Sequence, residues 1–315
     1  MKQFISVNDV DNINELVNST INLKHNKYAY QDLGKHKVLG LIFMNPSLRT
    51  RLSTQRAAIN LGMEVMVMNF NGEGWALETK QGVIMDGDKS EHIKEASAVI
   101  GQYCDIIGLR SFPGLIDRDK DYQEKVLSDF ILYSGKPVIN LESATLHPLQ
   151  SLADIITIEE NKKSNRPKVV LTWAPHPRAL PQSVANSFLQ WVRKMDYELC
   201  ITHPEGYELN DQFISGIPIV YNQQKAFEAA DFIYVKNWSS YQDYGRVLST
   251  DSNWMVTLDK LNHTNNARIM HCLPVRRNVV ISDDVLDSDH SIVIQEAANR
   301  VYAAQSVLKD ILLSK

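Results

Sequence analysis

Arginine and hydroxyl side chains crowd into one short segment, Ser47-Leu48-Arg49-Thr50-Arg51, which lies between an expected strand and an expected helix. Free N–H groups at a helix start bind anions, and the helix dipole favours negative charge there. The guanidinium groups of Arg49 and Arg51 are planar forks suited to phosphate. Because cations at this end of a helix oppose its dipole, the segment favours a bound phosphate. The alternative is a solvated helix end with Ser47 as an ordinary N-cap.

The two common nucleotide-binding loops are missing from this sequence. It holds no GxxxxGK[ST] motif, and no GxGxxG follows the first expected strand. The glycine-rich piece at 71–75 is too short and too acidic to hold a pyrophosphate. A nicotinamide-dependent oxidoreductase is therefore disfavoured, and we expect no cofactor and no metal.

Other chemically capable side chains follow expected strands elsewhere in the chain. Arg110 ends one strand, His147-Pro148-Leu149-Gln150 follows another, and His271-Cys272-Leu273-Pro274-Val275-Arg276-Arg277 follows a third. Ligands in open parallel sheets bind outside the carboxyl ends of the strands. These groups are therefore expected to converge on the phosphate segment. A phosphate-binding protein without catalytic activity is the alternative, and the presence of both His147 and Arg110 disfavours it.

Strands alternate with helices along the whole chain, which predicts an α/β fold with parallel sheets flanked by helices. The expected strands are 38–44, 64–70, 105–109, 137–141, 168–173, 199–202, 232–235 and 268–271. The expected helices include 7–23, 48–61, 91–103, 182–195, 224–230 and 296–313, with a loop at 71–89. At about 150 residues per domain, the 315 residues predict two domains. We place them at 1–150 with the C-terminal helix 296–315, and at 151–295.

Composition excludes several classes of protein. A net charge of −4 shows no basic footprint for nucleic acid, and 44% hydrophobic residues exclude intrinsic disorder. No apolar run reaches membrane-spanning length, and the first residues do not resemble a secretory signal. The 3 cysteines are far apart and form no CxxC pair. We therefore expect a cytoplasmic protein that binds neither nucleic acid nor membrane.

Four motifs in order resemble the aspartate/ornithine carbamoyltransferase superfamily along essentially the whole chain. S-x-R-T-R, HPxQ, HCLP and E-x-x-N-R match the segments that begin at Ser47, His147, His271 and Glu296. The resemblance implies two domains, with the C-terminal helix packing back on the first. It also implies direct carbamoyl transfer from carbamoyl phosphate without a covalent enzyme intermediate, so Cys272 is not expected to act as a nucleophile.

Within this superfamily the chain resembles the N-acylornithine branch. Lys236 stands where ordinary ornithine enzymes carry an acid, and a lysine would repel the α-ammonium of free ornithine. Other features shared with that branch are Trp75, Glu142, the His176-Pro177-Arg178 run and the Arg276-Arg277-Asn278 extension. Acetyl types carry a glutamate at the position of Ser90 and a modified lysine at that of Val280, whereas succinyl types carry a proline at the former. A glutamate at position 90 would repel the succinyl carboxylate, whereas neutral Ser90 leaves room for it.

The resemblance implies a role for each group. Residues expected to hold carbamoyl phosphate are Ser47, Leu48 through its backbone, Arg49, Thr50, Trp75, Arg110, His147, Gln150, Cys272 and Leu273 through their carbonyls, and Arg276. Those expected to act in catalysis are Arg49, Thr50, Arg110, His147, Gln150 and Arg276. The acylornithine is expected to contact Glu142, His176, Arg178, Lys236 and Ser90, which could also be the N-cap of helix 91–103.

The implied reaction carbamoylates the δ-amine of N-succinyl-L-ornithine, giving N-succinyl-L-citrulline and phosphate in arginine biosynthesis. N-acetylornithine and ornithine are the alternative substrates, while Glu142 and HCLP disfavour aspartate. The family places Trp75 in a neighbouring subunit's active site, which implies a homotrimer with shared sites. Segments 71–90 and 238–245 are candidate lids that would exclude water.

Overall fold

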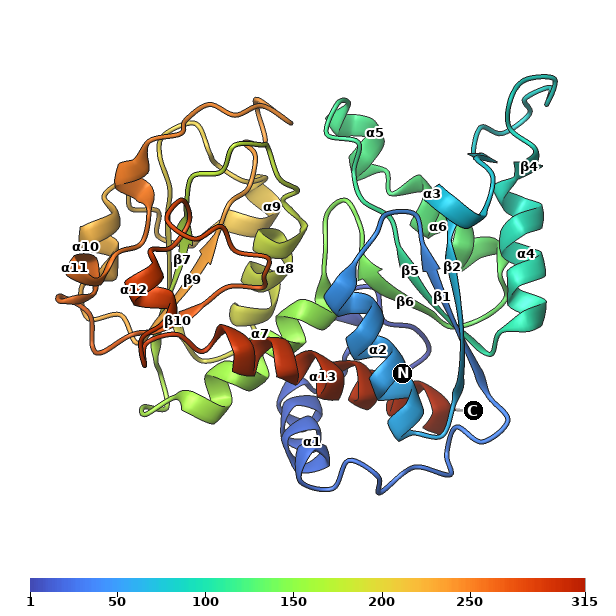
Figure 1. Cartoon of the computed structure of the whole chain (residues 1–315), viewed down its shortest axis with the longest axis horizontal. Coiled ribbons are helices and arrows are strands. Elements are labelled where there is room, and N and C mark those ends of the chain that lie inside the picture. Colours follow the sequence, from blue (N-terminus) through green and yellow to red (C-terminus); the bar gives the residue numbers. More distant parts are fainter. Residues whose placement is uncertain (315) are drawn as a thin grey trace. The chain divides into compact units, whose positions relative to one another are not determined.

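A computed structural model describes residues 1–314, and its contacts divide the chain into two compact units (Figure 1). The first unit comprises Met1–Gly114, Asp119–Leu149 and Arg300–Lys315. The second comprises Leu115–Arg118 and Gln150–Asn299. The chain therefore crosses between units within two helices, α7 (Pro148–Asn161) and α13 (Val293–Leu313), and again at the short excursion 115–118.

The first unit is built on a four-stranded parallel sheet in the order β2-β1-β5-β6, so the prediction of parallel strands is confirmed. Its strands are β1 (Val38–Phe43), β2 (Glu64–Asn69), β5 (Ile106–Arg110) and β6 (Val138–Glu142). β2 lies on one side of β1, and β5 and β6 continue on the other. The winding thus reverses between β1 and β5, and the carboxyl end of that pair is where such sheets bind ligands.

The second unit repeats this plan in the order β10-β9-β7-β8, again with all pairings parallel. Its strands are β7 (Lys168–Trp173), β8 (Glu198–Thr202), β9 (Phe232–Lys236) and β10 (Arg268–Met270). Here the winding reverses between β7 and β9. Trp173 and Lys236 pair at the carboxyl end of that junction, so the second ligand-binding edge begins at these residues.

Helices flank both sheets, and apolar side chains fill the interior. In the first unit these helices are α1 (Ile13–His25), α2 (Leu48–Asn60), α4 (Ile93–Tyr103) and α6 (Lys125–Tyr133), with the short α5 (Arg118–Tyr122) at the excursion. In the second they are α8 (Ser183–Val192), α9 (Asp211–Ile214), α10 (Gln223–Phe227), α11 (Leu258–Leu261) and α12 (Asp283–Leu286), with a 3₁₀ turn at Ser252–Trp254. Phe130 and Ile107 are completely buried in the first core, and Phe227 and Ile233 in the second. Burying each such side chain stabilises the fold by about 1.5–3 kcal/mol.

The C-terminal helix α13 packs on the first unit, as predicted. Its residues from Arg300 onward belong to that unit. Gln305 accepts a 2.9 Å hydrogen bond from Asn60 of α2, and both side chains are buried. This contact joins two segments far apart in the sequence and holds the helix against α2.

Several expected element bounds are wrong. The first helix begins at Ile13 rather than Val7, because Asn12 accepts the N–H of Glu15 and caps it there. Residues 7–9 form a separate 3₁₀ turn. The expected loop 71–89 contains most of α3 (Phe70–Glu73) and β3 (Leu77–Glu78), and β3 pairs with β4 (Glu91–His92). No element was predicted where α5 and α6 lie.

Ser90 is not the N-cap of the following helix. Since Glu91 and His92 are drawn into the pairing with β3, α4 begins two residues later than expected, at Ile93. The ring of His92 caps it, with Nδ1 accepting the N–H of Lys94. Ser90 is left exposed on the loop.

Candidate active site

The phosphate segment lies where the topology predicts it, between the end of β1 and the first turn of α2. Ser47 is the N-cap residue of α2, but its side chain makes no capping hydrogen bond. Leu48 is 68% exposed, Arg49 is partly exposed and Thr50 is buried. An ordinary N-cap therefore does not account for Ser47. The first turn of a 13-residue helix is available to an anion here.

A buried charged cluster lies along the same edge of the sheet. Arg110, the last residue of β5, pairs with the carboxylate of Glu142, the last residue of β6. The same carboxylate oxygen lies 3.4 Å from His147 Nε2. All three side chains are less than a tenth exposed, and the ring of Phe112 lies 4.1 Å from the Arg110 guanidinium carbon. Glu142 thus compensates the buried cation and fixes the two groups expected to face a carbonyl oxygen.

Arg300 joins this cluster, although the sequence indicated no individual role for it. Its Nη2 donates a 2.7 Å hydrogen bond to Thr50 Oγ1, and Nη1 lies 3.5 Å from His147 Nε2. Its side chain is only 5% exposed. Arg300 therefore links the phosphate segment to the histidine. The sequence feature that could have indicated Arg300 is the group of polar residues Glu296, Asn299 and Arg300, all of which are buried in α13.

In the second unit, the Glu296 carboxylate arranges the loop after β10. One oxygen accepts the N–H of His271 at 2.8 Å, and the other accepts Gln150 Nε2 at 3.2 Å. His271 Nδ1 in turn accepts the N–H of Leu273 at 2.8 Å. Leu273 has a φ of +54°, a strained conformation that is typical of functional loops. Gln150 and the loop that carries Cys272 and Leu273 are therefore set by the same side chain.

Three cations expected to bind the substrates, Arg178, Lys236 and Arg276, lie around His176, which follows β7. Its Nε2 accepts a 3.0 Å hydrogen bond from Arg276 Nε, and its Nδ1 lies 2.8 Å from the carbonyl oxygen and 3.1 Å from the backbone nitrogen of Arg178. Burial lowers the pKa of His176, and the charges of Arg276, Lys236 and Arg178 lower it further. Lys236 is 8% exposed, and Arg178 and Arg276 are exposed. This edge thus combines a neutral imidazole with three cations and suits a substrate bearing carboxylates.

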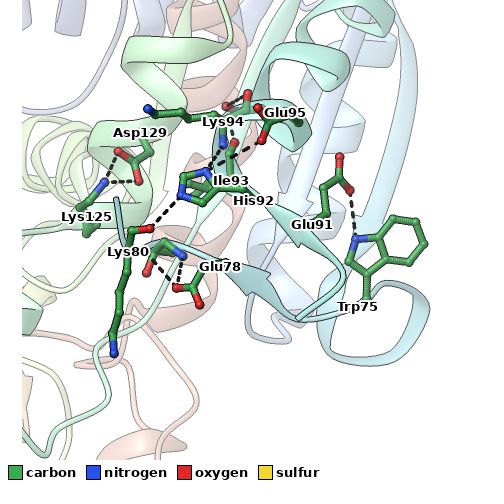
Figure 2. A network of polar contacts seen from close by, with 12 residues as sticks. Trp75, Glu78, Lys80, Glu91, His92, Ile93, Lys94, Glu95, Lys125 and Asp129 are labelled. Atoms are coloured by element: carbon green, nitrogen blue, oxygen red, sulfur yellow. Dashed lines mark hydrogen bonds and ion pairs between the residues drawn. The ribbon is translucent and has the colours of Figure 1, made fainter. Parts of the chain in front are cut away.

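Trp75 and Ser90 flank the ribbon formed by β3 and β4 in the first unit, with Trp75 two residues before β3 and Ser90 directly before β4. Trp75 is 56% exposed, and its Nε1 donates a 3.0 Å hydrogen bond to Glu91 Oε2 (Figure 2).

Within residues 1–314, no group of three or more acidic, histidine or cysteine side chains could hold a metal ion. Over the same residues, no helix is both long and apolar enough to span a bilayer. Among these residues, Cys104, Cys200 and Cys272 are buried and belong to no disulfide.

Comparison with known proteins decides the family. The model of the aspartate/ornithine carbamoyltransferase carbamoyl-phosphate-binding domain matches residues 2–160, and that of the Asp/Orn-binding domain matches residues 181–311. The chain belongs to the aspartate/ornithine carbamoyltransferase family. It is 56% identical to the N-succinylornithine carbamoyltransferase of Bacteroides thetaiotaomicron over 314 residues, covering 99% of each chain. It is 33% identical to the N-acetylornithine carbamoyltransferase of Xanthomonas campestris, covering 98% and 97% of the two.

Solved structures of family members share the fold over nearly the whole chain. An acetylornithine transcarbamylase complexed with acetylcitrulline superposes with a TM-score of 0.92 at 33% identity, covering 99% of each chain. A glutamate-to-serine mutant of N-acetyl-L-ornithine transcarbamylase, complexed with carbamyl phosphate and N-succinyl-L-norvaline, gives a TM-score of 0.92 at 34% identity. That pair covers 99% of this chain and 100% of the mutant. The predicted two-domain α/β carbamoyltransferase fold is therefore confirmed.

Proposed function

We propose that this carbamoyltransferase transfers the carbamoyl group of carbamoyl phosphate to the δ-amine of N-succinyl-L-ornithine, in arginine biosynthesis. The products are N-succinyl-L-citrulline and phosphate. Identity to two N-succinylornithine carbamoyltransferases, at 56% and 55% over the whole chain, supports this substrate. The observation that carries the proposal is the set of three cations around neutral His176, because N-succinylornithine bears two carboxylates and no α-ammonium.

The first unit binds carbamoyl phosphate in this proposal. The N–H groups of the first turn of α2, with Ser47, Arg49 and Thr50, hold the phosphate. Arg110 and His147, fixed by Glu142, face the carbonyl oxygen. Arg300 adds a second guanidinium beside Thr50. Preorganised cationic donors at the oxygen where charge develops are the main source of acceleration in acyl transfer.

Residues of both units supply the remaining contacts in this proposal. Gln150 and the carbonyls of Cys272 and Leu273, aligned through Glu296, accept and orient the carbamoyl NH₂. Arg178, Lys236, Arg276 and His176 bind the acylornithine, and Ser90 faces its acyl group. Glu142 is assigned a further contact with the acylornithine amide, beside its pairing with Arg110. Each of these assigned contacts can be tested by substituting the residue singly and measuring carbamoyl transfer.

The chemical step is a direct transfer. The neutral δ-nitrogen attacks the carbamoyl carbon, and the negative charge that develops on the carbonyl oxygen is stabilised by Arg110 and His147. The bond from this carbon to the phosphate ester oxygen then breaks, and phosphate leaves with that electron pair. The nitrogen loses one proton to solvent or to the departing phosphate. No cofactor enters this balance.

We further propose that the enzyme is a cytoplasmic homotrimer in which Trp75 completes the site of a neighbouring subunit. The exposed indole on the β3–β4 ribbon supports this assembly, as does the 80% exposed side chain of Ile84 at the tip of the same segment. Three cysteines that form no disulfide within residues 1–314 fit a reducing compartment.

The deciding experiment offers the purified chain carbamoyl phosphate with N-succinylornithine, N-acetylornithine or ornithine, and measures ureido product. We expect kcat/KM to be at least about tenfold higher for the succinyl substrate, the value of roughly one well-placed ionic contact. Preference for ornithine would overturn the charge argument built on Lys236. The absence of any ureido product would overturn the activity as a whole.

A further inference from the structure

The ribbon that carries Trp75 and Ser90 closes a loop, residues 79–90, which we call the lid loop. β3 and β4 are parallel, with Leu77 opposite Glu91 and Glu78 opposite His92. Extended by one residue, this register places Ser90 beside Ala76 at the amino end of the ribbon. Trp75 lies one residue further and is hydrogen-bonded to Glu91 (Figure 2). Both proposed substrate-contacting residues are therefore positioned by the ribbon rather than by the main sheet.

Glu78 ties the two ends of the lid loop together. The side chain of Glu78 is 11% exposed, and its carboxylate accepts hydrogen bonds from the N–H groups of Thr79 at 2.8 Å and Lys80 at 2.9 Å and from the Lys89 ammonium at 3.2 Å. The Lys80 N–H, aided by Lys89, lowers the pKa of Glu78 although burial opposes the shift. The carboxylate thus stays charged and holds Lys89, next to Ser90, against the start of the loop.

His92 provides the second tie, and it does so with both ring nitrogens. Nδ1 accepts the N–H of Lys94 at 3.2 Å and thereby caps α4. The proton of the neutral ring must then lie on Nε2, which donates to the carbonyl of Lys80 at 3.1 Å. The side chain of His92 is 12% exposed, its bond to the Lys94 N–H is partly buried, and its bond to the Lys80 carbonyl lies at the surface. The imidazole of His92 therefore links Lys80, at the start of the lid loop, to Lys94 in the first turn of α4.

We propose that His92 is a positioning residue for carbamoyl transfer, because its tie to Lys80 holds the ribbon and so sets where Ser90 and Trp75 meet the substrates. The proposal rests on the function proposed above. His92 itself need not touch a substrate, since its bonds go to the backbone of Lys80 and Lys94. Misplacing substrate-positioning groups by about 1 Å can cost up to about a hundredfold in rate.

Two substitutions separate the tie from the cap. His92→Ser keeps a favoured N-cap side chain but is too short to reach Lys80, whereas His92→Ala loses both bonds. The matched control is Asn12→Ser, which exchanges the N-cap of α1 in the same unit without touching the lid loop. Readouts are the thermal midpoint, KM and kcat for both substrates, and amide hydrogen exchange over residues 79–90.

We expect His92→Ser to keep the thermal midpoint of the unaltered chain. KM for N-succinylornithine should rise about tenfold while kcat falls less than about threefold, because Ser90 meets the acyl group and not the reacting amine. Exchange over the lid loop should accelerate, and Asn12→Ser should change none of these values. If His92→Ser matches the unaltered chain in kinetics and exchange, the ring is only an N-cap and the proposal is wrong.

The exchange measurement separates this proposal from the proposed function. If the unaltered chain carbamoylated none of the three amines, the function would fail. Faster exchange in His92→Ser would still establish the tie to Lys80. If the unaltered chain is active and exchange accelerates without any change in KM, the tie exists but does not position the substrates, which also overturns the proposal.

Discussion

Arg300 is the side chain whose removal should most clearly separate chemistry from folding. Its guanidinium bridges Thr50 and His147, where charge develops on the carbonyl oxygen in the proposed reaction. We expect Arg300→Gln, which retains a donor but loses the charge, to lower kcat about a hundredfold. The control is Arg193→Gln, which also removes a guanidinium that donates to two backbone carbonyls. Arg193 lies at the end of α8 in the second unit and is not assigned to the site. Equal kcat values in the two variants would contradict a catalytic role for Arg300.

Ser90 should decide between acyl substrates by charge alone. A glutamate at this position would place a negative charge beside the succinyl carboxylate and repel it. The same glutamate would lie beside the neutral methyl of an acetyl group, which it does not repel. We therefore expect Ser90→Glu to shift the succinyl-to-acetyl ratio of kcat/KM towards N-acetylornithine by at least about tenfold, or roughly 1.4 kcal/mol. Ser90→Gln, of the same shape without the charge, should shift the ratio less. An unchanged ratio in Ser90→Glu would remove Ser90 from the acyl site.

His176 should stay neutral to a lower pH than an ordinary histidine, because its pKa is lowered. Burial first, and then the charges of Arg276, Lys236 and Arg178, lower its pKa below the usual 6.5. Between the lowered pKa and 6.5 the unfolded chain binds more protons, so this group makes the folded state more stable as pH rises through that window. A proton NMR titration should give a midpoint below 6.5, and Arg276→Gln should raise it. Arg246→Gln, at another exposed arginine of the second unit, should not.

At the scale of elements, the turn after α2 depends on glycine for two reasons. Gly62 has a φ of +78°, and an added Cβ would lie 2.0 Å from the carbonyl oxygen of Gln31. Gly216 has the same φ of +78°, but open space surrounds its Cβ position. We expect Gly216→Ala to lower the free energy of unfolding by about 1 kcal/mol from backbone strain. Gly62→Ala adds a backbone clash and should cost at least about 2 kcal/mol more, as measured by denaturant unfolding. Equal losses would show that Gln31 can move aside.

Element type was predictable wherever the local pattern was strong, and less so where distant pairing intervened. The strand 168–173 was predicted residue for residue, because a short apolar run rich in β-branched residues, between a basic loop and a proline, favours a buried strand over a helix. The start of α4 was wrong by two residues because Glu91 and His92 pair with β3, 14 residues earlier. A serine before a helix is a good local N-cap signal, yet it could not compete with that pairing. The ribbon itself carries no period-2 pattern long enough to detect.

At the scale of the whole molecule, order along the chain predicted which loops follow the strand ends but not which side chains meet. Strand-end positions identified Arg110 and His147, since parallel sheets gather their carboxyl ends at one edge. The link from Thr50 to Arg300 spans 250 residues and requires α13 to return to the first unit. No periodicity in the sequence encodes that return. The motif resemblance pointed to the helix, and only the fold showed that Arg300 contacts Thr50 and His147.

The proposed trimer makes a quantitative prediction for mixed assemblies. Suppose each site uses Arg110 of its own subunit and Trp75 of the neighbour. Trp75→Ala and Arg110→Ala trimers should each be nearly inactive. After dissociation and equal mixing, three-quarters of the trimers are hybrids, and each hybrid of a closed ring contains one intact site in three. About a quarter of the parental activity should therefore return.

Mixing Arg110→Ala with His147→Ala is the matched control, because both side chains contact Glu142 of the same unit and act within one subunit. That mixture should recover nothing, since every site keeps one defect. Recovery in the first mixture alone establishes that Trp75 crosses to a neighbour, with sedimentation confirming the trimer. If the first mixture also stays inactive while trimers form, Trp75 serves its own subunit. The exposure of Trp75 beside the β3–β4 ribbon would then not be explained by contact with a neighbouring subunit.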